Sequence, residues 1–184
     1  VSLLHIRNSH YTTNDVIATF LLSLSLLFSI RIYSHGRKID YLLAGFIGGL
    51  GVSAKYNVGF FCMTILAAHL ARQLKFGRLN WTWSTNLLII IAAIASLGGF
   101  LMATPFSVLD YTRFIADFRN QYGYGSENWL GQNALPVPLL YSTTLVQGFG
   151  LLPLIFAITG GVFAWRYNPR YLAIVIAAPA AYLA

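Results

Sequence analysis

Charged residues are scarce in this sequence. Only 9% of the 184 residues are Asp, Glu, Lys or Arg, whereas 57% are hydrophobic. Soluble chains average about 25% charged residues, so this composition excludes an ordinary soluble domain. It is typical of an integral membrane protein, and the length would accommodate about six apolar segments of about 20 residues each.

Three common sequence signals are also missing. The single cysteine, Cys62, excludes a disulfide bond within the chain. The first residues lack a basic n-region and a small-residue cleavage site, so we do not expect them to form a signal peptide. The chain has 16 glycines but neither a phosphate-binding loop nor a dinucleotide-binding fingerprint.

Apolar runs follow one another along the chain, separated by polar connections. They span residues 16–33, 41–54, 58–71, 85–104, 136–165 (broken by Pro153) and 171–184. These runs lack the alternation of barrel strands, and a helix pairs its backbone groups within the bilayer. We therefore predict an all-α, polytopic transmembrane helix bundle with about six membrane segments. Residues 1–184 would form part of one transmembrane domain.

Basic residues predict the orientation of this bundle. Alternate connections contain Arg31, Arg37, Lys38, Arg72, Lys75, Arg78, Arg166 and Arg170. The positive-inside rule places those connections on the cytoplasmic side, together with Asp40, and the other connections on the outer or lumenal side. The net charge of +7 is thus a topology signal. The sequence has no patch of basic and aromatic residues, so the charge does not predict a nucleic-acid partner.

The longest outer connection covers residues 105–135 and would contain an outer loop and an amphipathic segment. Its first part has apolar side chains at helical spacing, which predicts a short helix lying on the membrane: Phe106, Leu109, Phe114, Ile115 and Phe118. The glycine- and aromatic-rich stretch 121–133 would either cover an acceptor site or merely connect two spans.

Polar residues crowd the start of the first long apolar run. Residues 7–15, "RNSHYTTND", include Arg7, His10, Asn14 and Asp15. Asn14 or Asp15 would cap the following helix, and a capping role does not exclude a catalytic one. A single histidine without visible co-ligands indicates an interfacial side chain better than a metal ligand. A divalent metal is therefore the one cofactor left open.

Lys55 stands between two apolar runs that are each short for a membrane span. An ionisable residue near membrane depth marks either a functional site or a side chain that snorkels to the interface, and both interpretations stay open. A turn at Lys55-Tyr56-Asn57 would separate two helices. The glycines that precede it predict close helix packing: Gly45, Gly48, Gly49 and Gly51.

Three stretches in this order resemble the GT-C membrane glycosyltransferases: "HIRNSHYTTNDV", "GLGVSAKYNVG" and "LMATPFSVLDY". More narrowly, the chain resembles the dolichyl-phosphate-mannose protein mannosyltransferase and aminoarabinose transferase group (family 39-like) over nearly its whole length. The resemblance implies a fragment, because the family's first outer loop with its principal catalytic acid would precede Val1. We therefore expect the 184-residue chain alone to be inactive.

The resemblance implies transfer of a sugar from a polyprenyl- or dolichyl-phosphate carrier to a protein or lipid acceptor on the outer or lumenal face. Such a donor needs cations or a metal at its phosphate, and the acceptor needs a carboxylate to take its proton. Asp15 would support catalysis, with the base upstream. The substrate-binding residues would be Lys55, Arg7, His10, Asn14 and Tyr56. The expected location is the plasma (inner) membrane of a prokaryote or the endoplasmic reticulum of a eukaryote.

Two other functions stay open from the residues alone. Broken helices beside a charged residue also form the ion sites of secondary transporters. The polar groups here gather at one face, however, and no acidic residue lies mid-span. A non-catalytic membrane subunit is the third class, which would tolerate substitution of the outer polar residues.

Overall fold

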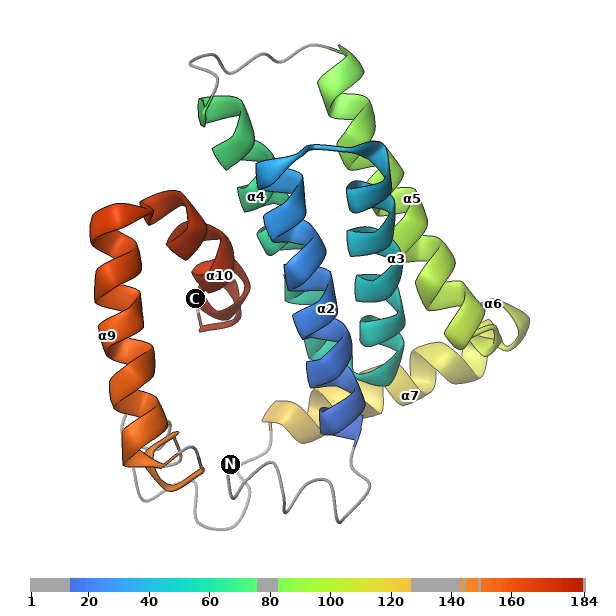
Figure 1. The fold of residues 1–184 in the computed structure, drawn as a ribbon. Coiled ribbons are helices and arrows are strands. Elements are labelled where there is room, and N and C mark those ends of the chain that lie inside the picture. The colour runs from blue at the N-terminus through green and yellow to red at the C-terminus, as the bar shows by residue number, and fades with distance from the viewer. Residues whose placement is uncertain (1–13, 76–82, 127–142, 144, 149, 184) are drawn as a thin grey trace.

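A computed structural model describes the chain except residues 1–13, 76–82, 127–142, 144, 149 and 184 (Figure 1). Every regular element in the described part is helical, which confirms the all-α prediction for these residues. In chain order the elements are α2 (Asn14–Ser34), α3 (Lys38–Ala54), the 3₁₀ turn η1 (Tyr56–Phe60), α4 (Phe61–Lys75), α5 (Trp83–Ala103), α6 (Phe106–Leu109), α7 (Tyr111–Ser126), α9 (Leu151–Tyr167) and α10 (Pro169–Leu183).

Among the described residues, two helices are long and apolar enough to cross a membrane. They are α2, with 21 residues, and the 19 residues Thr85–Ala103 of α5. The apolar helices α3, α4, α9 and α10 are shorter, with 15 to 17 residues each. The prediction of a helical membrane protein thus agrees with the structure, whereas the arrangement of about six spans stays a prediction.

The run 136–165 is interrupted beside Pro153, as predicted, although the break itself falls at Gly150: residues 145–148 are helical, Gly150 is not, and α9 begins at Leu151. Pro153 lies in the first turn of α9. The first backbone N–H groups of a helix have no partner within it, so proline fits this position without losing a hydrogen bond. Residues 136–142 of that run lie outside the described part of the chain.

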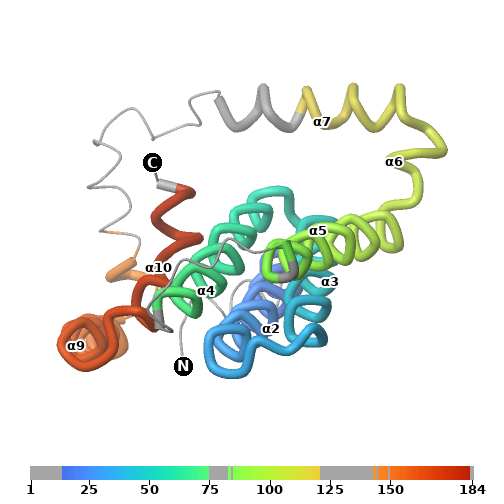
Figure 2. The backbone as a smooth tube through the Cα atoms, turned by 90° about the horizontal axis from the view of Figure 1, so that it is seen from above, coloured from blue at the N-terminus to red at the C-terminus, as the bar shows by residue number. Residues whose placement is uncertain are grey.

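Helices α2, α3, α4 and α5 form the centre of the molecule. Helix α3 packs between α2 and α5, α4 packs against α2, and α10 covers α4 (Figures 1 and 2). The buried core joins side chains from these helices, among them Ile32, Tyr41, Phe61 and Ile174. The candidate site lies where α2 begins and α3 ends, beside the last turns of α10.

Glycine allows α3 and α5 to touch backbone to backbone, as predicted. A Cβ atom on Gly45 or Gly49 would overlap the backbone oxygen of Ala92 or Ser96, and one on Gly48 would overlap the Phe61 ring. Only the absence of a side chain permits this approach. Close packing holds α3 in place and thereby positions the turn that follows it.

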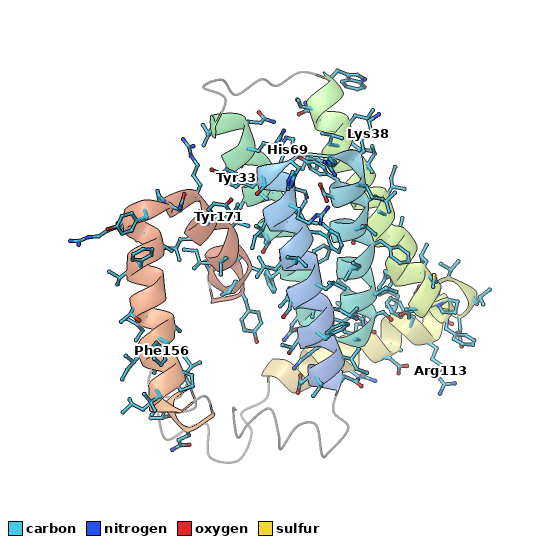
Figure 3. The ribbon with its side chains drawn as sticks, in the orientation of Figure 1. Tyr33, Lys38, His69, Arg113, Phe156 and Tyr171 are labelled. Carbon is cyan, nitrogen blue, oxygen red and sulfur yellow. The ribbon has the colours of Figure 1, made fainter. Side chains whose placement is uncertain are left out.

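A short connection makes α2 and α3 antiparallel. It contains Gly36 at φ 65°, a left-handed conformation that glycine adopts without strain. As a result, the start of α2 and the end of α3 lie at one end of the bundle. Figure 3 shows Tyr33, Lys38 and His69 together at the opposite end.

The predicted amphipathic helix is two helices, α6 and α7. The break falls at Asp110, whose carboxylate accepts a hydrogen bond from the Arg113 backbone N–H at 3.3 Å and so caps α7. Figure 1 shows α7 at the level where α2 begins and α3 ends, and Figure 2 shows that it lies to one side of the bundle, away from α2. Its position on a membrane surface stays a prediction.

Candidate functional site

Asp15 and Lys55 form an ion pair at this end of the bundle. The Lys55 ammonium donates to Asp15 Oδ1, and the two residues are 40 positions apart in sequence. The side chains are 47% exposed for Lys55 and 42% exposed for Asp15. An ammonium has three donors and a carboxylate accepts about four hydrogen bonds, so this one contact leaves both groups able to bind a ligand.

The chain turns at Lys55, as predicted. Lys55 has an extended backbone (φ −156°, ψ 121°), its N–H ends α3 by bonding Gly51 O at 2.9 Å, and its carbonyl accepts from Val58 N–H at 3.0 Å. Val58 packs directly over Gly51, where a Cβ would lie 2.8 Å from Val58 Cγ1. The small residue in the last turn of α3 therefore lets η1 fold back, which directs Lys55 toward α2.

Asp15 lies inside the first turn of α2 rather than before it. Its carboxylate is bonded to Lys55, and a negative charge in a first turn also interacts favourably with the helix dipole. The helix therefore positions Asp15, and the ion pair does not depend on a capping role. Asn14 is the first, exposed residue of α2, and its role in substrate binding stays a prediction.

A cavity of about 340 Å³ opens beside the ion pair. This volume lies within the range of small-molecule sites, which is about 300–1,000 Å³. Its lining comes from three places in the chain, namely the first turns of α2, the segment 55–61 that contains η1, and the last turns of α10. The polar side chains in the lining are Asp15, Thr19, Lys55, Asn57 and Tyr182, and the others are apolar.

Tyr56 connects the Lys55 turn to α7. Its ring packs edge-on against Phe118 and Phe114, with centroid separations of 5.2 and 6.4 Å. Tyr56 does not belong to the cavity lining. The structure thus shows it holding α7 beside the turn, and the predicted contact with substrate stays a prediction.

Two predicted site residues, Arg7 and His10, lie outside the described residues. Their roles in substrate binding stay predictions. Within the described part of the chain, no group of three or more His, Cys, Asp or Glu side chains is arranged to hold a metal ion. A divalent metal therefore stays the one cofactor left open.

Asn57 and Tyr182 are cavity residues that the sequence analysis missed. The Asn57 amide donates to Tyr182 Oη at 3.4 Å, across 125 positions of sequence. Asn57 is the last residue of the predicted turn Lys55-Tyr56-Asn57, so its position beside Lys55 was a usable signal. Tyr182 lies in an apolar run, where nothing local distinguishes it.

A second polar cluster was also missed, at the opposite end of the bundle. Arg31 Nε donates to the fully buried Asp40 at 2.9 Å, and Tyr41 Oη bonds His69 Nδ1 at 2.7 Å. Gln73 continues this network at 2.5 Å from His69 Nε2. The sequence placed Asp40 near basic residues but gave no sign of its burial.

Comparison with known proteins identifies the family. No curated protein and no solved structure matches the chain. A family model described as dolichyl-phosphate-mannose-protein mannosyltransferase matches residues 1–98, which is more than half of the 184. The match includes Asp15, Lys55 and Asn57 and two of the three stretches that carried the resemblance, and it ends before α10. The resemblance is therefore confirmed over residues 1–98, and the chain belongs to the dolichyl-phosphate-mannose-protein mannosyltransferase family.

Proposed function

We propose that this protein is an integral membrane glycosyltransferase that moves a sugar from a polyprenyl- or dolichyl-phosphate carrier to a protein or lipid acceptor on the outer or lumenal face. The observation that carries the proposal is the half-exposed Asp15–Lys55 ion pair beside the cavity. Family membership supports glycosyl transfer in a membrane. The donor, the acceptor and the roles of individual residues belong to the proposal.

The reaction breaks the bond between sugar C1 and a phosphate oxygen, and the electron pair leaves with the phosphate. The acceptor oxygen forms the new bond to C1 and gives its proton to a base. A phosphate is a good leaving group without protonation, so the protein's task there is to stabilise negative charge. Lys55 is a compact point charge suited to that task.

Asp15 acts through Lys55 in this proposal. Its carboxylate holds the ammonium beside the cavity before the donor arrives. A carboxylate near C1 also stabilises the positive charge that develops there during transfer. The family resemblance puts the base that accepts the proton elsewhere, so Asp15 is a supporting residue.

The location of the pair suits a lipid-linked donor. Asp15 lies at the start of α2, one of the two helices long enough to cross a membrane. The end of such a helix lies near the membrane–water interface, which is where the phosphate of a lipid carrier also lies. The amphipathic helix α7 at the same end is consistent with this depth.

The test is substitution of Lys55 in the complete protein. We expect Lys55→Ala to lower transfer from a polyprenyl-phosphate sugar by about 100-fold, the usual effect of removing one charge-stabilising group. Release of free polyprenyl phosphate in native membranes measures transfer without knowledge of the acceptor. Lys55→Arg should restore only part of the rate, because the guanidinium has a different geometry.

Lys38→Ala is the matched control, since Lys38 is an exposed lysine at the opposite end of the bundle. It should transfer at the normal rate. If Lys55→Ala also transfers normally at equal expression, then Lys55 is a snorkelling side chain and the proposal loses its main support.

A further inference from the structure

One wall of the cavity is formed by residues outside the part of the chain that the family model matches. Residues 1–98 are matched, whereas Ala178, Pro179 and Tyr182 reach the cavity from α10. Helix α10 packs against α4 and η1, which fixes this wall relative to Lys55. The cavity thus combines a matched part that contains the ion pair with a second part that comes from the far end of the chain.

Tyr182 is held in the cavity by two contacts. Its ring lies edge-on to Phe60, with a centroid separation of 5.5 Å. Its hydroxyl oxygen accepts a hydrogen bond from the Asn57 amide at 3.4 Å. Both partners belong to η1, the turn that begins directly after Lys55, so the hydroxyl has a defined place near the ammonium.

The pair formed by Asn57 and Tyr182 is suited to binding a hydroxyl group. The contact between them uses one amide hydrogen and one lone pair of the phenol oxygen. The Asn57 amide oxygen can still accept, and the Tyr182 hydroxyl hydrogen can still be donated. A donor and an acceptor on neighbouring atoms match a sugar hydroxyl, which needs both.

We propose that Asn57 and Tyr182 together recognise one hydroxyl of the donor sugar and thereby select which sugar is transferred. The inference rests on the proposed function, because phosphate at Lys55 puts the attached sugar in the same cavity of about 340 Å³. A site that binds a hydroxyl discriminates against the analogue lacking it, since its own polar groups are then left unpaired.

The test compares donors in the complete protein. The donors are the polyprenyl-phosphate sugar that the wild type uses best and a set of analogues that each lack one of its hydroxyls. Tyr182→Phe keeps the ring and its contact with Phe60 but removes the hydroxyl. For the parent sugar we expect kcat/KM to fall about tenfold, the effect of one hydrogen bond of typical strength.

The specific signature is a loss of discrimination. For one deoxy analogue, the one lacking the recognised hydroxyl, kcat/KM should be the same in Tyr182→Phe and in the wild type. Asn57→Leu should reduce discrimination against the same analogue. The control is Tyr167→Phe, which removes the hydroxyl of an exposed tyrosine on α9 that does not line the cavity and should leave every ratio unchanged.

The outcomes separate this inference from the proposed function. If the wild type transfers sugar but Tyr182→Phe lowers kcat/KM equally for parent and analogues, or for none of them, the inference is overturned and the proposed function stands. If the wild type transfers from no polyprenyl-phosphate sugar, the proposed function fails and the inference fails with it.

Discussion

Two ion pairs of similar chemistry lie at opposite ends of the same two helices. Arg31 and Asp40 link the end of α2 to the start of α3, with Nε and Oδ1 2.9 Å apart. Asp15 and Lys55 link the start of α2 to the residue after α3. The Asp40 side chain is 0% exposed, whereas the Asp15 side chain is 42% exposed.

This difference in exposure favours different roles for the two pairs. A buried carboxylate needs its partner, because an unpaired charge in the interior is strongly unfavourable. A half-exposed pair contributes only about 0–1 kcal/mol to stability. Asp15 and Lys55 therefore do little for the fold, and their place beside a cavity favours a role in binding.

The prediction with the largest expected effect concerns the orientation of the bundle in the membrane. In a Cys62→Ser background, cysteine at Asn120 on α7 should react with an impermeant maleimide in intact cells. Cysteine at His35, in the connection with Arg31, Arg37 and Lys38, should react only after permeabilisation, because basic connections stay in the cytoplasm. The opposite labelling would put Lys55 on the cytoplasmic side and remove the outer site.

Loss of Arg31 should have the largest effect on stability. Arg31→Ala leaves the buried Asp40 carboxylate without its partner, and we expect the free energy of unfolding to fall by about 3 kcal/mol. Thermal unfolding in detergent measures the change. Adding Asp40→Asn should recover part of it, since the buried charge is then gone. Equal stability of Arg31→Ala and Arg37→Ala, the exposed control in the same connection, would contradict a structural role for this pair.

Asp15→Asn should separate activity from stability at the other end. Asparagine has the shape of aspartate and is well tolerated at the start of a helix, but it carries no charge. We expect normal insertion and unfolding temperature with about 100-fold slower transfer, because electrostatic support of Lys55 is lost. Asp117→Asn, an exposed acid on α7 outside the cavity lining, should transfer normally. Near-normal turnover by Asp15→Asn would reduce Asp15 to a helix-stabilising residue.

The smallest expected effect concerns the network beside Asp40. Tyr41→Phe removes the hydroxyl that bonds His69 Nδ1 at 2.7 Å in a buried position. We expect a loss of about 1 kcal/mol in the free energy of unfolding, with unchanged transfer. Tyr111→Phe, at an exposed tyrosine, should change neither quantity. A transfer defect in Tyr41→Phe without a stability change would show that the opposite end also contributes to function.

Local patterns explain which predictions succeeded. The helical class follows from apolar runs, the turn follows from Lys55 between two short runs, and the α3–α5 contact follows from Gly45 and Gly49. Each of these depends on residues that are close in sequence. The deviations were equally local, since the break at Gly150 instead of Pro153 and the break at Asp110 depend on where a helix begins.

The sequence by itself determined a helical chain of membrane composition and, through its motifs, its family and two of the site residues. Only the tertiary structure decided that Asp15 meets Lys55, that Tyr182 reaches Asn57, and that Asp40 is buried. Hydropathy describes each segment against its surroundings, but it does not specify which segments pack together. That choice came from the antiparallel turn at Gly36 and the glycine contacts of α3, which bring distant residues to the same end of the bundle.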